Sequence, residues 1–151
     1  MTIGGEAREV ALAEVQTVHS LARDKTMRER LTGLVAAVDG GEVADGDEAE
    51  LLESVLELGL QTGRIRAYYG PGGEQAALTT LRRLPRGRTR SESAREVTDA
   101  LRTLQGSRLG SVSIAAVAPG AFTLTIDADG VDVSVRLDSN GARLTSVGAG
   151  G

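Results

Sequence analysis

Arginine residues gather in one short segment in the middle of the chain, where Glu92 is the only acid among them. The cluster consists of Arg82, Arg83, Arg86, Arg88, Arg90 and Arg95. Guanidinium groups pair with phosphates, and nucleic-acid binding is driven mainly by such charge contacts. Because Pro85 and Gly87 interrupt the segment, it predicts a connector between two helices. Nucleic-acid binding is one hypothesis, and docking on an acidic protein surface or a merely solvated basic turn are the alternatives.

A glycine-rich stretch, Tyr69-Gly70-Pro71-Gly72-Gly73-Glu74-Gln75, precedes a predicted helix. The free backbone N–H groups of Gly70, Gly72 and Gly73, with the helix dipole, are suited to holding a phosphate or a carboxylate. The stretch has neither the lysine nor the preceding strand of a P-loop, and Glu74 would repel an anion. Two interpretations therefore stand, an anion site and a tight turn with an acidic first turn.

The other reactive side chains form no catalytic or metal-binding pattern. His19 has no accompanying nucleophile or orienting carboxylate in a recognisable arrangement. The acidic runs at residues 39–50 and 127–132 lack the ligand spacing of an EF-hand. The chain has no cysteine, which excludes disulfides, thiol catalysis and cysteine-ligated metals. We therefore expect a protein that is not an enzyme and that uses no metal or cofactor.

The composition is that of one ordinary globular domain. Of 151 residues, 40% are hydrophobic and 25% are charged, which is enough apolar material to close a core. Tyr68, Tyr69 and Phe122 are the only aromatic residues, so the core must be aliphatic and stacking on bases is disfavoured. Charged side chains within the first ten residues argue against a signal peptide, and no apolar stretch is long enough to span a membrane. We expect a cytoplasmic location.

Charge is distributed unevenly along the chain, although the net charge is only −4. Residues 1–60 carry 13 acidic and 5 basic side chains, whereas residues 61–110 carry 10 basic and 4 acidic ones. Such polarity predicts interactions with partners rather than a particular fold.

Apolar side chains at helical spacing predict helices over about residues 5–22 and 25–38, with Asp24 or Thr26 as the N-cap of the second. A third helix follows an acidic loop and begins at Asp47, because Asp47-x-x-Glu50 has the form of a capping box. It ends either at Thr62-Gly63 or at Gly70-Pro71. We favour the later end, which would place Gly59 and Gly63 on one helical face.

A short fourth helix is predicted over residues 73–84, and Pro85-Arg86-Gly87 breaks it. A fifth helix follows, capped by Ser91 or Ser93 and ended by Gly106. From residue 111 onward the apolar period changes to two, which is typical of strands, and Asp129-Gly130 and Asn140-Gly141 are strong hairpin signals.

The expected turns also predict which residues pair between strands. The turn at residues 129–130 places Ile126 opposite Val133, Leu124 opposite Val135 and Phe122 opposite Leu137. A loop at residues 118–120 places Val112 opposite Ile126 and Ile114 opposite Leu124. The turn at residues 140–141 places Leu137 opposite Leu144 and Asp138 opposite Arg143. Every apolar side chain then faces another, and a slip of one residue would move them all to the other face.

These elements predict an α+β fold in a single domain over residues 1–151. About five helices in residues 5–105 pack on one face of a C-terminal four-stranded antiparallel β-meander at residues 111–147, and residues 148–151 form a frayed tail. The edge strands of the sheet are available to pair with a second copy or a peptide.

The functional expectation is a non-enzymatic, cytoplasmic protein-interaction module: an adaptor, assembly factor or regulator that binds a protein partner and self-associates. It is based on the missing catalytic patterns, the aliphatic core, the polarised charge and the free sheet edge. A nucleic-acid-binding regulator that uses the arginines of residues 82–95 is the first alternative. A small enzyme or phospholigand binder that uses the glycine turn at residues 70–75 is the second.

Overall fold

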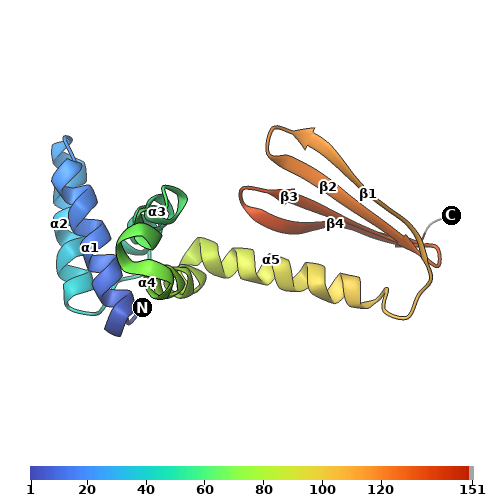
Figure 1. The fold of residues 1–151 in the computed structure, drawn as a ribbon, viewed down its shortest axis with the longest axis horizontal. Helices are drawn as coiled ribbons and strands as arrows, with labels where there is room; N and C mark the ends of the chain where they lie inside the picture. Colours follow the sequence, from blue (N-terminus) through green and yellow to red (C-terminus); the bar gives the residue numbers. More distant parts are fainter. Residues whose placement is uncertain (150–151) are drawn as a thin grey trace. The chain divides into compact units, whose positions relative to one another are not determined.

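The computed structural model describes residues 1–149 and consists of five helices followed by a four-stranded antiparallel sheet, which confirms the predicted α+β class (Figure 1). The elements are α1 (Gly5–Leu21), α2 (Lys25–Asp39), α3 (Asp47–Gln61), α4 (Arg64–Arg83), α5 (Pro85–Arg102), β1 (Leu109–Ala118), β2 (Ala121–Ala128), β3 (Val131–Asp138) and β4 (Gly141–Ala149). The chain divides into two compact units, Met1–Arg88 and Thr89–Gly151. Helix α5 therefore begins in the first unit and continues in the second.

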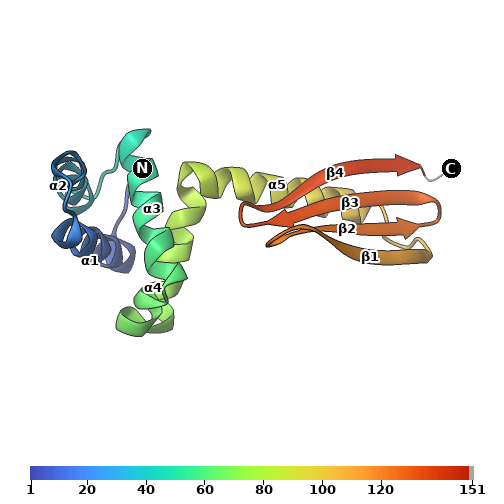
Figure 2. The ribbon, with the colours of Figure 1, turned by 90° about the horizontal axis from the view of Figure 1, so that it is seen from above.

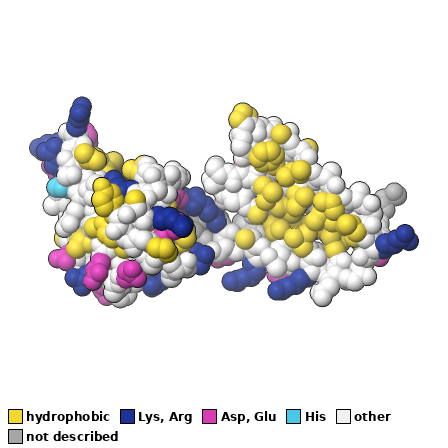
Figure 3. Space-filling view, in the orientation of Figure 1, with side chains coloured by type: hydrophobic (Ala, Val, Ile, Leu, Met, Phe, Trp, Pro, Cys, Tyr) yellow, Lys and Arg dark blue, Asp and Glu magenta, His cyan; other side chains and the backbone are white. Residues whose placement is uncertain are grey.

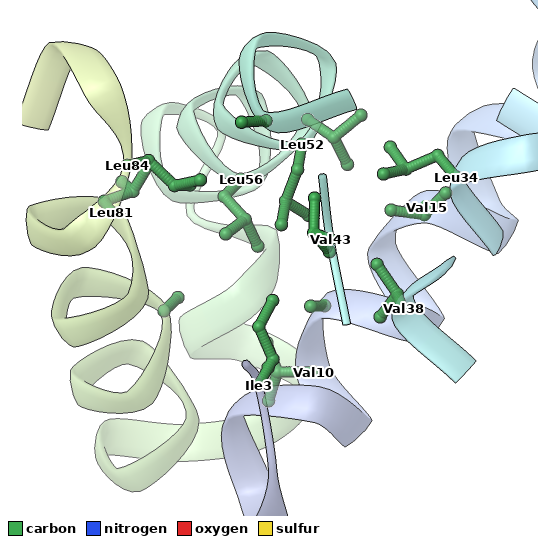
Figure 4. Packing of buried hydrophobic residues seen from close by; sticks show 14 of the residues in the cluster. Ile3, Val10, Val15, Leu34, Val38, Val43, Leu52, Leu56, Leu81 and Leu84 are labelled. Carbon is green, nitrogen blue, oxygen red and sulfur yellow. The ribbon is translucent and has the colours of Figure 1, made fainter. Parts of the chain in front are cut away.

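The first unit has an aliphatic core enclosed by its amphipathic helices. The largest fully buried apolar side chains are Leu31, Leu34, Leu52, Leu56, Ile65 and Leu84. Figure 4 shows Leu52 and Leu56 of α3 beside Val43, with Leu81 and Leu84 at the end of α4. Asp24 caps α2, as predicted, because its carboxylate accepts the backbone N–H of Met27 at 2.7 Å.

The predicted later end of the third helix is wrong. Helix α3 ends at Gln61, and Gly63 adopts a left-handed conformation with φ of 72° before α4 begins at Arg64. Helix α4 then passes Gly70, whose φ of 66° and ψ of −168° are not helical, and resumes at Pro71. Proline is tolerated there because the first residues of a helical segment need no N–H partner. Gly59 and Gly63 therefore do not share a helical face.

The predicted cap of the third helix and the predicted start of the fifth also differ from the structure, although α3 does begin at Asp47. The third helix has Gly46 as its N-cap, with no side-chain cap, so Asp47 and Glu50 do not form the predicted capping box. The fifth helix begins at Pro85 rather than at Ser91 or Ser93. Leu84 takes the extended conformation that a residue before proline prefers, and Pro85 occupies the first helical position. The predicted connector is consequently confined to Leu84, and the arginines from Arg86 to Arg95 lie in α5.

The sheet has the order β1-β2-β3-β4 (Figure 2). The predicted pairs of β2 with β3 are confirmed, including Ile126 with Val133, and so are Val112 with Ile126 and Ile114 with Leu124 between β1 and β2. The β3–β4 register is wrong by two positions, because the turn consists of Ser139 and Asn140. The pairs there are Leu137 with Ala142, Val135 with Leu144 and Asp138 with Gly141.

Two further differences concern β4. Arg143 lies opposite Arg136 rather than opposite Asp138. It still reaches the Asp138 carboxylate diagonally at 2.9 Å, so the predicted ion pair forms although the two residues are not cross-strand partners. A register shift follows, and β4 continues through Gly148 and Ala149, which the sequence analysis placed in a frayed tail. Gly150 and Gly151, the rest of that tail, lie outside the described residues.

The apolar face of the sheet packs against α5. Val97 and Ala100 of this helix are buried together with Val133 and Val135 of β3, and Leu124, Leu137 and Leu144 join the cluster. The helices before α5 bury their apolar stripes in the separate cluster of the first unit.

Candidate functional site

Arg86, at the centre of the predicted arginine cluster, is held by acidic side chains of α3. Its Nε lies 3.1 Å from Oε2 of Glu53, whose side chain is 0% exposed, and its Nη1 lies 3.3 Å from Oε2 of Glu57. Its Nη2 also donates to Ser54 Oγ at 2.9 Å. Arg86 therefore belongs to the packing of α5 on α3, where its charge is neutralised.

Three other arginines of the cluster come together on the first unit. Arg82 and Arg83 in the last turn of α4, and Arg88 in the first turns of α5, line one open hollow of about 430 Å³ together with Met1 and Asp45. All three side chains are exposed. In the described part of the chain, none of the three side chains makes a salt bridge or hydrogen bond. The hollow therefore presents three guanidinium groups against one carboxylate.

The last two arginines of the cluster lie in the second unit. Arg90 packs beside the backbone of Gly141, where β4 begins. Arg95 shares a shallow hollow with Glu92, Glu96 and Asp99 of the same helix, which places it among acidic side chains. Within the first unit, the structure thus brings Arg82, Arg83 and Arg88 together at one hollow, whereas Arg86 pairs with α3.

Two carboxylates, Glu6 and Glu74, lie at the glycine turn. Gly73 is buried, and a Cβ at this position would overlap Tyr69, so the glycine allows the two segments of α4 to pack closely. A Cβ at Gly72 would lie 3.0 Å from Oε1 of Glu6, and Glu74 pairs with Arg66 at 2.9 Å. With Glu6 and Glu74 at this helical N-terminus, the site that Gly70, Gly72 and Gly73 would offer is electrostatically unfavourable for an anion.

A buried ion pair that the sequence analysis missed links α1 to α4. Glu14 is 1% exposed and accepts two hydrogen bonds from Arg64, at 2.5 Å from Nη2 and 3.0 Å from Nε. A Cβ on Gly59 would overlap Oε2 of Glu14, so this glycine makes room for the carboxylate. Burial and the nearby Glu14 raise the pKa of Tyr69, which keeps the phenol neutral.

One signal for these buried acids was available in the sequence. Glu14 lies in the apolar stripe of α1 between Ala11 and Val15, and Glu53 follows Leu52 on the buried side of α3. A carboxylate in an apolar stripe requires a buried cationic or hydrogen-bonding partner. The partners, Arg64 and Arg86, are distant in sequence, and nothing local identifies them.

The remaining candidates have structural partners. His19 Nε2 lies 3.0 Å from Thr32 Oγ1 and connects α1 to α2. Asp129 accepts the backbone N–H of Arg108 at 2.8 Å. Asp127 and Asp132 face each other across β2 and β3, and burial, then the hydrogen bond and charge of Asp132, raise the pKa of Asp127. Within residues 1–149, no three acidic or histidine side chains are placed to hold a metal ion.

The second unit leaves half of its apolar sheet face open. Val112 and Ile114 of β1 and Phe122 of β2 are 53%, 62% and 41% exposed, although they alternate onto the same face as Val133 and Val135. Figure 3 shows a gathering of hydrophobic side chains over this sheet. Helix α5 packs against β3, β4 and Leu124, so the open half-face, Val112, Ile114 and Phe122, lies beyond its reach.

Strand β1 also forms an unprotected edge. Its ten residues, Leu109–Ala118, include no charged side chain and no proline, which are the usual protections of an edge strand. At the opposite edge, β4 carries Arg143 and a register shift after Leu144. The open half-face therefore lies next to the unprotected edge, because Val112 and Ile114 belong to β1 itself.

Among the helices of the described residues, none combines the length and the apolar character needed to cross a membrane. Comparison with protein-family models, with curated proteins and with solved structures finds no match to this chain.

Proposed function

We propose that this protein is a non-enzymatic, cytoplasmic protein-interaction module, of the adaptor, assembly-factor or regulator kind, that self-associates through the open half-face of its sheet. The observation that carries the proposal is the exposure of Val112, Ile114 and Phe122 on a face whose other half is buried under α5. Contiguous exposed apolar side chains of this kind mark interaction sites. Association removes their surface from water and so provides the driving force.

A second copy of the chain is the occupant that fits this surface. The open half-face and the edge beside it have no charged side chain, so a two-fold axis through them brings no like charges together. The neighbours of Ile114 on the other face of β1 are Ser113 and Ala115, which are small and uncharged as well. A partner recognised by charge would require complementary charges here, and β1 offers none.

The geometry favours face-to-face packing over edge pairing. Two stacked sheets lie about 10 Å apart, and side chains from both inner faces fill the space between them. The open half of one sheet would cover the open half of the other, beside each copy's own α5. Pairing of two β1 edges would instead leave Val112, Ile114 and Phe122 uncovered.

The test is the molar mass of the full chain, measured by light scattering over a range of concentrations, for the wild type and two matched variants. Ile114→Asp puts a charge into the open half-face, and Ser113→Asp puts the same charge on the other face of the same strand. We expect the wild type to be a dimer. The Ile114→Asp variant should be a monomer, and the Ser113→Asp variant should remain a dimer. Equal loss in both variants would indicate edge pairing, and a wild-type monomer at all concentrations would contradict self-association.

A further inference from the structure

We propose that the hollow lined by Arg82, Arg83 and Arg88 is a binding site for phosphate groups, independent of the self-association proposed above. Three exposed arginine side chains line it without a salt-bridge or hydrogen-bond partner in residues 1–149, and Asp45 is the only acid that lines the hollow. Arginine is suited to phosphate because its planar group donates two parallel hydrogen bonds to phosphate oxygens.

The corner between α4 and α5 holds these arginines in place. Leu84 is 1% exposed, and Gly87 packs so closely on the Leu81 carbonyl that a Cβ there would overlap it. Glu53 accepts the backbone N–H groups of Arg86 and Gly87 at 3.3 Å and 2.8 Å. These contacts fix the backbone on both sides of the corner, so the three side chains project from a rigid base.

The surroundings indicate how a phosphate compound would bind. No aromatic residue lines the hollow, so bases have no platform for stacking and the contacts are to phosphate alone. A neighbouring hollow shares Met1 and Asp45 and includes Glu42 and Glu48, which confines an anion to the arginine side. Because the whole chain is acidic, with a net charge of −4, attraction of a polyanion must come from such a local site.

Two sources provide this chemistry, the backbone of a nucleic acid and a small polyphosphate. The experiment measures fluorescence anisotropy of a labelled oligothymidylate at low and moderate salt, with inorganic tripolyphosphate as the competitor and as a separate ligand in calorimetry. The variant is Arg82→Gln with Arg83→Gln and Arg88→Gln. The matched control, Arg23→Gln with Lys25→Gln and Arg30→Gln, removes three charges from the exposed start of α2 in the same unit.

We expect the wild type and the control to bind the oligonucleotide at low salt, and the arginine variant to bind about tenfold or more weakly. Loss of three phosphate contacts should also reduce the slope of log K against log salt by about 2 for a single strand. Binding of tripolyphosphate alone, abolished in the variant, would support the site and identify the small source. Equal binding by variant and wild type, equal losses in variant and control, or no binding of either probe would overturn the proposal.

Discussion

The carboxylate of Glu53 accepts the backbone N–H of Gly87 at 2.8 Å, so a side chain of α3 caps the first turn of α5. The same carboxylate accepts the backbone N–H of Arg86 and the Nε of its side chain. Pro85, the first residue of α5, has no N–H to satisfy. A capping interaction from another helix thus lets α5 begin directly after α4, which is the arrangement that places Arg88 beside Arg82 and Arg83.

Replacement of Glu53 by alanine should destabilise the first unit strongly. It leaves two backbone N–H groups without their acceptor and creates a cavity at a position that is 0% exposed. A buried N–H group that loses its acceptor costs about 1–3 kcal/mol. Urea denaturation followed by circular dichroism measures this, with Glu50→Ala on the same helix as the control, where we expect about 0.5 kcal/mol or less. A loss for Glu53→Ala as small as that of the control would contradict the capping role.

Three glycine-to-alanine substitutions should distinguish the effect of close packing on stability from the effect of helix propensity. In Gly59→Ala the new Cβ would overlap Glu14 and Ile65, and in Gly87→Ala it would overlap the Leu81 carbonyl. Both variants should unfold more readily than the wild type. Gly33 in α2 has no atom within 4 Å of such a Cβ, so Gly33→Ala should stabilise by about 0.5–1 kcal/mol. The midpoints of thermal unfolding rank the three, and stabilisation by Gly59→Ala or Gly87→Ala would disprove these contacts.

Most of the sheet could be predicted from the sequence, because strand pairing there depends on local turn residues and a period of two. The pair of Ile126 with Val133 follows directly from the Asp129-Gly130 turn. The β3–β4 register was missed because Ser139 and Asn140 form the turn, and Asp138 accepts the Asn140 N–H at 2.9 Å. The dipeptide Asn140-Gly141 fits a turn at residues 139–140 as well as one at residues 140–141. The observed and the predicted register also put the same side chains of β4, up to Leu144, on the apolar face, so the period of two does not distinguish them.

The helix boundaries and the arginine site depend on contacts that are distant in sequence. Pro85 and Gly87 predict a break between two helices, and the break is present at Leu84. It is short because α5 already begins at Pro85, where Glu53, 34 residues from Gly87, supplies a cap. Helical geometry then separates arginines that are adjacent in sequence. Arg86 turns toward α3, whereas Arg82, Arg83 and Arg88 remain free to line one hollow. The sequence singles out the arginines but does not indicate which of them line one hollow.

Two carboxyl groups of the sheet should affect stability in opposite directions as pH changes. The pKa of Asp127 is raised by burial and by Asp132, so at neutral pH its ionised form destabilises the folded sheet. Asp127→Asn should therefore raise the unfolding midpoint at neutral pH. The gain should disappear as the pH falls below the ordinary carboxyl pKa, where Asp127 is protonated in both the folded and the unfolded state.

Asp138 should show the opposite effect on stability, because its pKa is shifted in the other direction. The Asn140 N–H, followed by Arg136 and Arg143, lowers the pKa of Asp138. Its stabilising effect is present above the ordinary carboxyl pKa and is lost as the pH falls through the lower folded-state value, so Asp138→Asn should lower the midpoint at neutral pH. Thermal unfolding of both variants across the acidic range checks the signs, and parallel curves for the two would be inconsistent with them.

Asp45 should limit the affinity of the arginine hollow for phosphate. It is the only carboxylate among the residues that line this hollow, and its charge opposes an anion held by Arg82, Arg83 and Arg88. Asp45→Asn should therefore tighten oligonucleotide binding several-fold at low salt, with a smaller gain at higher salt because of screening. Anisotropy titrations at two salt concentrations measure this, and an unchanged or weaker affinity would place the anion elsewhere.

Self-association through the open half-face is tested most directly by a distance between two copies. The chain has no cysteine, so Ser113→Cys provides a single spin-label site on the face of β1 opposite to Ile114. Double electron–electron resonance on the labelled full chain should show one defined distance between copies, and the added substitution Ile114→Asp should remove it. A labelled chain that shows no inter-copy distance at concentrations well above those of the light-scattering series, or one whose distance persists with Ile114→Asp, would contradict the account.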